Sequence, residues 1–323
     1  MADVRFIGSN ALKKAVATLA EGPLWNAREQ ALYWIDTIGK KMFRYDPATD
    51  VVADRSLIYR PSALASFPGG GLLLALKKGV ALYRFETGEM RSLQLDGLDF
   101  KEAVFNDGAC DPAGRFWIGS RDKNVKNPVG QLYRIDADYG VTVMSGSFTC
   151  SNGIAWSLDR RTLYHVDTYP GLIYAYDFDP ATGAVADRKV HIDYQGATWH
   201  PDGCTVDAEG GLWVAEVEGS RLARYAPDGA LDRVVDVPVS KPTSMAFGGP
   251  DLSTMFVTSM RYGLSEQSLA DQPLAGTVMM LDVGVKGLAE PDFAGSWGTA
   301  PVFVSDEDRR RLAAQRAAQG GRS

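Results

Sequence analysis

Short runs of β-branched and aromatic residues recur along the chain, and turn residues separate them. The runs repeat at intervals of roughly 40–50 residues, which is the period of propeller blades. They begin near Tyr33, Leu72, Phe116, Leu163, Leu212 and Met255. A second β-rich run follows each one after a turn, as in a hairpin, and no long segment before residue 300 has helical periodicity. The pattern predicts an all-β fold, a six-bladed β-propeller with four-stranded blades around a central channel.

The two ends of the chain differ from this repeat. Residues 4–7 and 15–19 are short apolar or alternating runs, which predict N-terminal strands that complete the last blade. Residues 305–323 are polar and lack a periodic apolar face, which predicts a short helix or a disordered tail. We therefore expect a single propeller domain over residues 1–304, followed by the tail at 305–323.

A polar residue recurs at one phase of the repeat, about ten to twelve residues before each run, which is the span of one strand and a turn. Because the innermost strand of every blade faces the channel, residues at this phase are expected to converge there. They are Glu21, Ser62, Asn106, Asn152, Asp202 and Ser244. The two carboxylates and two amides among them offer the hard oxygen ligands that calcium or magnesium requires.

We call these six residues the ring positions. Ordinary turns offer another interpretation of some of them. Asn106-Asp107-Gly108, Asn152-Gly153 and Asp202-Gly203 are sequences that tight turns favour, because Asn, Asp and Gly tolerate left-handed conformations. Independent turn residues, however, have no reason to share one phase of the repeat. Glu21-Gly22-Pro23 is also not a common turn sequence. The shared phase favours a site.

Two further candidates stand two residues before ring positions. Arg60 could reach the hydroxyl or carboxylate groups of a substrate at the channel mouth, and a solvated surface arginine is the alternative. His200 could accept a proton or orient Asp202, and simple packing beside Trp199 is the alternative.

Composition limits the classes of function. A hydrophobic share of 45% in 323 residues supports a large core, and a net charge of −6 without a basic stripe argues against nucleic acid as a partner. No apolar run is long enough to span a membrane, and the N-terminus lacks the pattern of a signal peptide. The cysteines, Cys110, Cys150 and Cys204, have no C-x-x-C spacing, so we expect a reducing, cytoplasmic location. The oligomeric state stays open.

Several longer segments are more specific than any single residue. They are Glu21-Gly22-Pro23-Leu24-Trp25, Phe105-Asn106-Asp107-Gly108, Ser151-Asn152-Gly153-Ile154-Ala155-Trp156, His165-Val166-Asp167-Thr168, His200-Pro201-Asp202-Gly203 and Lys241-Pro242-Thr243-Ser244-Met245. In their order and spacing they resemble the gluconolactonase, regucalcin (senescence marker protein) and luciferin-regenerating-enzyme family, over nearly the whole chain.

The resemblance implies a propeller with one divalent metal ion in the channel that hydrolyses sugar lactones. Glu21, Asn152 and Asp202 match the metal ligands of the family, and Asp202 matches its proposed general base. Asn106 would orient the substrate or bind the metal weakly. Calcium suits these oxygen ligands best, and zinc, manganese, magnesium or iron are the other possibilities.

The chain also departs from the family pattern at two places. Val104 stands where many members have an arginine, two residues before Asn106. Arg121 begins a stretch from which relatives often offer an acidic substrate contact. We therefore expect Arg121, together with Arg60 and His200, to take part in substrate binding.

The expected reaction opens a sugar lactone to an aldonic acid, by metal polarisation of the carbonyl and attack of an activated water. Either Asp202 or a hydroxide on the ion could be the base. A metal-dependent esterase or organophosphate hydrolase is the first alternative, and a non-catalytic calcium-binding or interaction propeller is the second. No G-x-S-x-G sequence supports covalent acyl transfer.

Overall fold

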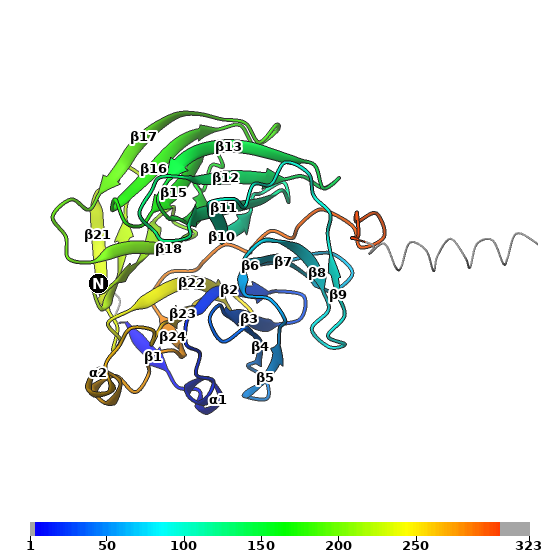
Figure 1. Cartoon of the computed structure of the whole chain (residues 1–323). Coiled ribbons are helices and arrows are strands. Elements are labelled where there is room, and N and C mark those ends of the chain that lie inside the picture. The colour runs from blue at the N-terminus through cyan, green and yellow to red at the C-terminus, as the bar shows by residue number, and fades with distance from the viewer. Residues whose placement is uncertain (1–3, 304–323) are drawn as a thin grey trace, which may run out of the picture.

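The structure, a computed structural model, describes residues 4–303 and consists mostly of antiparallel strands. Six four-stranded sheets form a ring (Figure 1). The predicted six-bladed propeller is therefore confirmed. The tail prediction for residues 305–323 lies outside the described residues.

The blades are numbered in chain order, and their strands are given from the channel outward. Blade 1 contains β2 (Ala20–Asn26), β3 (Ala31–Asp36), β4 (Lys41–Asp46) and β5 (Val51–Ser56), and blade 2 contains β6 (Pro61–Ser66), β7 (Leu72–Leu76), β8 (Gly79–Tyr83) and β9 (Met90–Ser92). Blade 3 contains β10 (Ala103–Cys110), β11 (Phe116–Asp122), β12 (Gly130–Ile135) and β13 (Val141–Phe148), and blade 4 contains β14 (Ser151–Trp156), β15 (Thr162–Asp167), β16 (Leu172–Phe178) and β17 (Val185–Asp193). Blade 5 contains β18 (His200–Val206), β19 (Leu212–Val217), β20 (Arg221–Tyr225) and β21 (Leu231–Asp236), and blade 6 contains β22 (Pro242–Gly248), β23 (Thr254–Ser259), β24 (Val278–Asp282) and β1 (Arg5–Ile7).

The N-terminal strand closes the ring by adding an outer strand to blade 6. β1 pairs antiparallel with β24, with Arg5 opposite Asp282, and the Arg5 guanidinium donates to the Asp282 carboxylate at 2.6 Å. The strand predicted at residues 4–7 is thus confirmed. Blade 6 has four strands only because the N-terminal strand β1 joins β22, β23 and β24, which come from the other end of the described chain.

The strand predicted at residues 15–19 is wrong. Helix α1 (Asn10–Lys14) comes first, because the Ser9 hydroxyl caps it by accepting from the Leu12 N–H at 3.0 Å. The chain then runs in irregular form, and only Leu19 makes an isolated bridge, to Met260. A second short helix, α2 (Glu266–Asp271), lies in the connection between β23 and β24.

Apolar side chains fill the space between neighbouring blades. Trp117 of blade 3 is fully buried and contacts Trp156 of blade 4, with ring centroids 6.0 Å apart, in a cluster that also contains Phe178. Similar clusters join the other neighbouring blades. A blade has no core of its own, so stacking supplies the burial and fixes where the inner strands lie.

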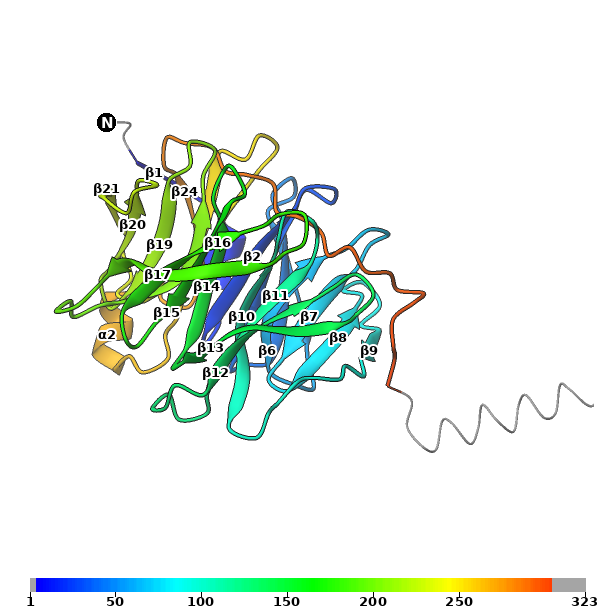
Figure 2. The same cartoon turned by 90° about the horizontal axis from the view of Figure 1, so that it is seen from above.

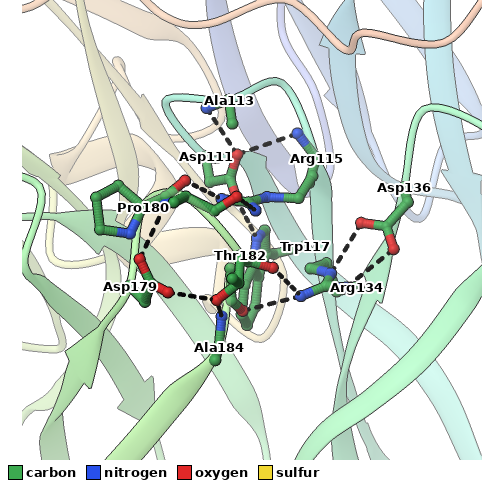
Figure 3. Close-up of polar contacts among 12 residues, drawn as sticks. Asp111, Ala113, Arg115, Trp117, Arg134, Asp136, Asp179, Pro180, Thr182 and Ala184 are labelled. Atoms are coloured by element: carbon green, nitrogen blue, oxygen red, sulfur yellow. Dashed lines mark hydrogen bonds and ion pairs between the residues drawn. The ribbon is translucent and has the colours of Figure 1, made fainter.

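A buried aspartate ties blade 3 to blade 4 (Figure 3). Asp111 has no exposed surface and accepts from the Trp117 indole N–H at 3.0 Å and from Arg115 Nε at 2.5 Å. Arg115 in turn donates from Nη2 to the Pro180 carbonyl at 2.9 Å, in the turn between β16 and β17. One carboxylate thus satisfies an indole and a guanidinium that both lie at the boundary between the blades.

Residues 283–303, here called the strap, cross the face of the ring opposite α2 (Figure 2). The Gly287 N–H donates to the Leu252 carbonyl at 2.8 Å, in the turn after β22. The Phe293 N–H donates to the Ser66 carbonyl at 2.7 Å, at the end of β6. The strap therefore connects blade 6 to blade 2 and lies over one end of the channel.

Asp111→Ala is expected to lower the free energy of unfolding by about 3 kcal/mol or more, because it leaves Arg115 and Trp117 buried without their acceptor. Urea denaturation measures the change. The matched control is Asp138→Ala, at an exposed turn where the carboxylate accepts only from the Gly140 N–H, and it should cost less than about 1 kcal/mol. Equal losses in the two variants would contradict a special role for Asp111.

Candidate functional site

A cavity of about 550 Å³ opens at the channel, on the same face of the ring as the loop that carries α2. We call it the mouth. Its lining includes every candidate from the sequence, namely Glu21, Arg60, Asn106, Arg121, Asn152, His200 and Asp202, and also Ser62. The residues come from inner strands or strand ends of five blades, so side chains far apart in the sequence do converge.

Ser244 is the exception to the predicted ring. It lines a second cavity, of about 590 Å³, on the strap face. The irregularity in β22 lies between Pro242 and Ser244, so Thr243 takes the position that corresponds to Ser62. The Thr243 hydroxyl donates to the Ala20 carbonyl at 2.6 Å. The ring prediction for Ser244 is therefore wrong by one residue.

A β-bulge lies at or next to the predicted ring position of every inner strand. In β10, Phe105 lies opposite Ser120 and Gly108 lies opposite Ile118, so two residues, Asn106 and Asp107, face one on the neighbouring strand. A bulge interrupts the strict alternation of side chains and re-aims them. This is why both Asn106 and Asp107 reach the mouth, although consecutive residues of a regular strand point to opposite faces.

The glycines after Asn152 and Asp202 allow the inner strands to approach closely. A Cβ at Gly153 would lie 2.5 Å from the Asp202 carbonyl oxygen, and one at Gly203 would collide with the Ser244 side chain. Neither glycine has positive φ, and both lie within strands. The turn interpretation of Asn152-Gly153 and Asp202-Gly203 is therefore wrong, because close packing at the channel requires these glycines.

The two amides are oriented with their oxygens free. Asn152 donates from Nδ2 to Asp202 Oδ1 and to the Thr168 hydroxyl, the latter at 3.0 Å. Asn106 donates from Nδ2 to the Ser151 carbonyl at 3.0 Å. Among residues 4–303, neither amide oxygen accepts a hydrogen bond. Both oxygens can therefore serve as ligands for a cation.

Of the carboxylates that line the mouth, those of Glu21, Asp107 and Asp202 make no ion pair with any described residue. Burial raises the pKa of Asp202 well above its usual range, repulsion from Asp107 adds to this, and the Asn152 hydrogen bond opposes it. Burial, then repulsion from Asp202 and Asp107, likewise raises the pKa of Glu21. Burial also raises the pKa of Asp107 to about 6. A bound cation would offset this repulsion, so the donor set fits a divalent metal ion.

Any metal ion here would need the amide oxygens. Within the described range, no three His, Cys, Asp or Glu side chains form a group that could hold a metal by themselves. Glu21, Asn152 and Asp202 are a mixed set of carboxylate and amide oxygens, which suits hard cations and not thiolate or imidazole metals.

The other candidates lie on the rim of the mouth. Arg60 is exposed, and Arg121 is half-buried and donates from Nη1 to the Asp122 carbonyl at 3.0 Å. The His200 imidazole lies beside Tyr169, with ring centroids 5.8 Å apart. In the described structure it makes no hydrogen bond to Asp202, so it does not orient that carboxylate by direct contact.

Sequence reasoning did not single out several lining residues. Asp107 directly follows Asn106, which is the one signal for it, but the sequence Asn106-Asp107-Gly108 also resembles a turn. Lys77, Tyr169 and Tyr262 lie in loops over the mouth, whose positions no strand periodicity predicts. Glu290 enters the strap-side cavity from a segment outside the blade repeat.

The match to known proteins agrees with this geometry. Residues 19–261 match the model of the family described as SMP-30/Gluconolactonase/LRE-like region. The chain belongs to this family. It is 38% identical to the 6-deoxy-6-sulfogluconolactonase of Pseudomonas putida, an alignment that covers 86% of this chain and 96% of that protein.

Other members of the family are similar over the same length. Regucalcin from Xenopus laevis is 35% identical, over 86% of this chain and 95% of that protein. A solved structure described as a calcium-binding protein, regucalcin, from Agrobacterium tumefaciens superposes with a TM-score of 0.83 at 29% identity, over 88% of this chain and 97% of that one. None of the helices in residues 4–303 has the length and apolar character needed to cross a membrane.

Gly153→Ala should destabilise the protein by about 1–3 kcal/mol, since the new methyl group must push β14 away from the Asp202 carbonyl. Thermal or urea unfolding checks this. Gly8→Ala is the control, because a Cβ there meets nothing within 4 Å. If Gly153→Ala is as stable as the control, the inner strands are not packed as described.

Metal-free protein is expected to lose stability as the pH rises from about 4 to about 7. The pKa of Asp107 is about 6 in the folded state against an ordinary 3.8, so the folded protein holds a proton that the unfolded chain releases. The stabilising contribution is complete below pH 4 and is lost as the pH passes through 6. Urea denaturation across this range measures it.

Asp107→Asn should flatten the fall in stability between pH 5 and 7, and so should a saturating divalent cation. Asp138→Asn, at an exposed turn, should leave it unchanged. A slope that is the same in all of these samples would show that burial does not raise the pKa of Asp107.

Proposed function

We propose that this chain opens a sugar lactone to the corresponding aldonic acid, with one divalent cation held by Glu21, Asn152 and Asp202. The observation that carries the proposal is the convergence of two carboxylates and two free amide oxygens in one cavity. Membership in the family supports the reaction class, and so does the relative named as a sulfogluconolactonase. The structure of regucalcin described as a calcium-binding protein supports the cation.

When bound, the cation would polarise the lactone carbonyl and stabilise the charge that develops on its oxygen during attack by water. Calcium is the first choice because every proposed ligand atom is an oxygen. Zinc, manganese, magnesium and iron are the other ions to test.

Asp202 is proposed as the general base. Its Oδ1 is fixed by the Asn152 amide, which is in turn held by Thr168. Its Oδ2 accepts no hydrogen bond from residues 4–303 and is left to take a proton from the attacking water. Asn152 would therefore have two roles, since its amide nitrogen orients the base while its oxygen faces the cation site.

The rim residues are proposed to hold the substrate. Asn106 is anchored through its amide nitrogen to the Ser151 carbonyl and can accept a substrate hydroxyl at its oxygen. Arg60, Arg121 and His200 surround the opening of the same cavity. With a volume of about 550 Å³, the mouth is within the range that encloses a small ligand.

We further propose a cytoplasmic location. Cys110, Cys150 and Cys204 are free thiols in the structure, two of them buried, which suits a reducing compartment. Cell fractionation with an antibody to the chain tests this directly.

The first experiment strips the purified protein of metal, restores single ions in turn, and follows ring opening of pentono- and hexonolactones against the spontaneous rate. We expect ion-dependent hydrolysis of at least one lactone. A panel of simple esters and phosphotriesters in the same assay distinguishes the two hydrolase alternatives. Metal binding without turnover of any compound would refute the proposal and favour a binding module.

Variants of the site should separate catalysis from metal binding. Asp202→Asn should lose roughly 10²–10⁴-fold in kcat, the usual contribution of a general base, while it keeps part of its metal affinity. Glu21→Gln and Asn152→Ala should weaken metal binding by about tenfold or more, measured by calorimetry. Ser244→Ala, on the strap side, is the control that should retain both properties. Wild-type turnover in all three site variants would contradict the assignment.

A further inference from the structure

The rim of the mouth carries its positive charge mainly on one side. Arg60 and Lys77 come from blade 2, Arg121 comes from blade 3, and all three line the mouth. We call these three residues the cationic arc. The proposed metal ligands Glu21 and Asp202 lie on inner strands of other blades, blades 1 and 5.

Backbone contacts make the cationic arc continuous. The Lys77 N–H donates to the Arg60 carbonyl at 2.8 Å, and the Phe105 N–H donates to the Lys77 carbonyl at 3.2 Å. In the next strand pair, Val104 lies opposite Arg121. The three cations are therefore neighbours along one side of the opening, with the buried, apolar Val104 between blade 2 and Arg121.

No carboxylate of residues 4–303 forms an ion pair with any member of the arc. Arg121 uses one N–H for a backbone carbonyl and keeps the others free. On the far side of the rim the situation differs, because Lys241 is paired with Glu218 at 3.5 Å. Unpaired positive charge is thus concentrated over blades 2 and 3.

Aromatic side chains also contribute to the rim. Tyr169 is 51% exposed and Tyr262 is 61% exposed, and His200 lies against Tyr169. These side chains present apolar faces with polar edges to whatever enters the mouth. A ligand in the mouth therefore meets cations on one side, aromatic rings on the other and carboxylates at the bottom.

From this arrangement we infer that the substrate is a sugar lactone with an anionic substituent, a sulfonate, phosphate or carboxylate, which the cationic arc binds. The inference rests on the proposed function. Arginine donates a fork of N–H groups that matches such oxyanions, and lysine adds a point charge. The anionic group is held at the rim, away from the carboxylates that would repel it, while the lactone carbonyl reaches the cation site below.

A purely electrostatic alternative makes a different prediction. If the arc only balances the acidic channel, without touching the substrate, its removal should change metal affinity and should affect charged and neutral substrates equally. If the arc binds the substituent, its removal should affect the charged substrate alone, mainly through KM, because the contact is remote from the reacting carbonyl.

The experiment compares kcat/KM of the metal-loaded enzyme for gluconolactone with that for the same lactone bearing a sulfonate or a phosphate at carbon 6, and for a glucarolactone bearing a carboxylate. The rates are corrected for spontaneous ring opening. We expect a preference of about tenfold or more for at least one anionic lactone, which identifies the group, and a fall in this preference at high salt.

Arg121→Met and Arg60→Met should each lower the ratio of anionic to neutral kcat/KM by about tenfold, and Arg121→Lys should restore part of it. The matched control is Lys189→Met, which removes an exposed lysine of outer strand β17 that does not line the mouth. It should leave the ratio unchanged.

The outcomes separate the two proposals. Turnover of neutral and anionic lactones at equal kcat/KM, or a ratio that the arginine variants do not change, overturns the role of the arc while lactone hydrolysis stands. A failure to hydrolyse any lactone overturns the proposed function and this inference with it.

Discussion

Close approach of the inner strands around the channel is the constraint on which the site depends. At Gly153 there is no room for a methyl group beside the Asp202 carbonyl, so the main chains of blades 4 and 5 pass almost in contact. The bulges in the same strands turn polar side chains into the remaining space. A donor set of this kind is built from rigid strands and not from loops, which limits how far the ligand atoms can move when an ion or a substrate is absent.

Charge is distributed along the axis of the mouth. Glu21, Asp107 and Asp202 lie together at the bottom. Burial and repulsion between these carboxylates raise the pKa of Glu21 and that of Asp202. The cationic arc lies above them at the rim. A pocket lined by carboxylates under a positive rim attracts small cations and organic anions to different depths.

The position of residues within the repeat predicts much of this site. The predictions that are wrong have identifiable physical reasons. Glu21, Asn106, Asn152 and Asp202 recur at nearly the same phase of the repeat, and closure of the ring brings them into one cavity as predicted. The prediction for Ser244 is wrong because the bulge of β22 lies at Thr243, and a spacing of about 40–50 residues is too coarse to fix a position to one residue.

Other features depend on contacts that no local pattern encodes. Asp107 faces the mouth only because a bulge breaks the two-residue period. The strap follows no repeat, since hydrogen bonds to turns of other blades hold it. Lys77 and Tyr262 belong to loops whose direction is set by tertiary packing, so sequence shows their chemistry but not their place.

The shared last blade has a consequence for how the chain is made. Strand β1 is synthesised before the other described strands, and its partner β24 follows only after the inner strands of all six blades, since Arg5 and Asp282 are 277 residues apart. Until then the three N-terminal strand residues have no sheet to join, and the ring cannot close. The ring therefore closes in one late step, after the inner strands of all six blades have been made, and not blade by blade.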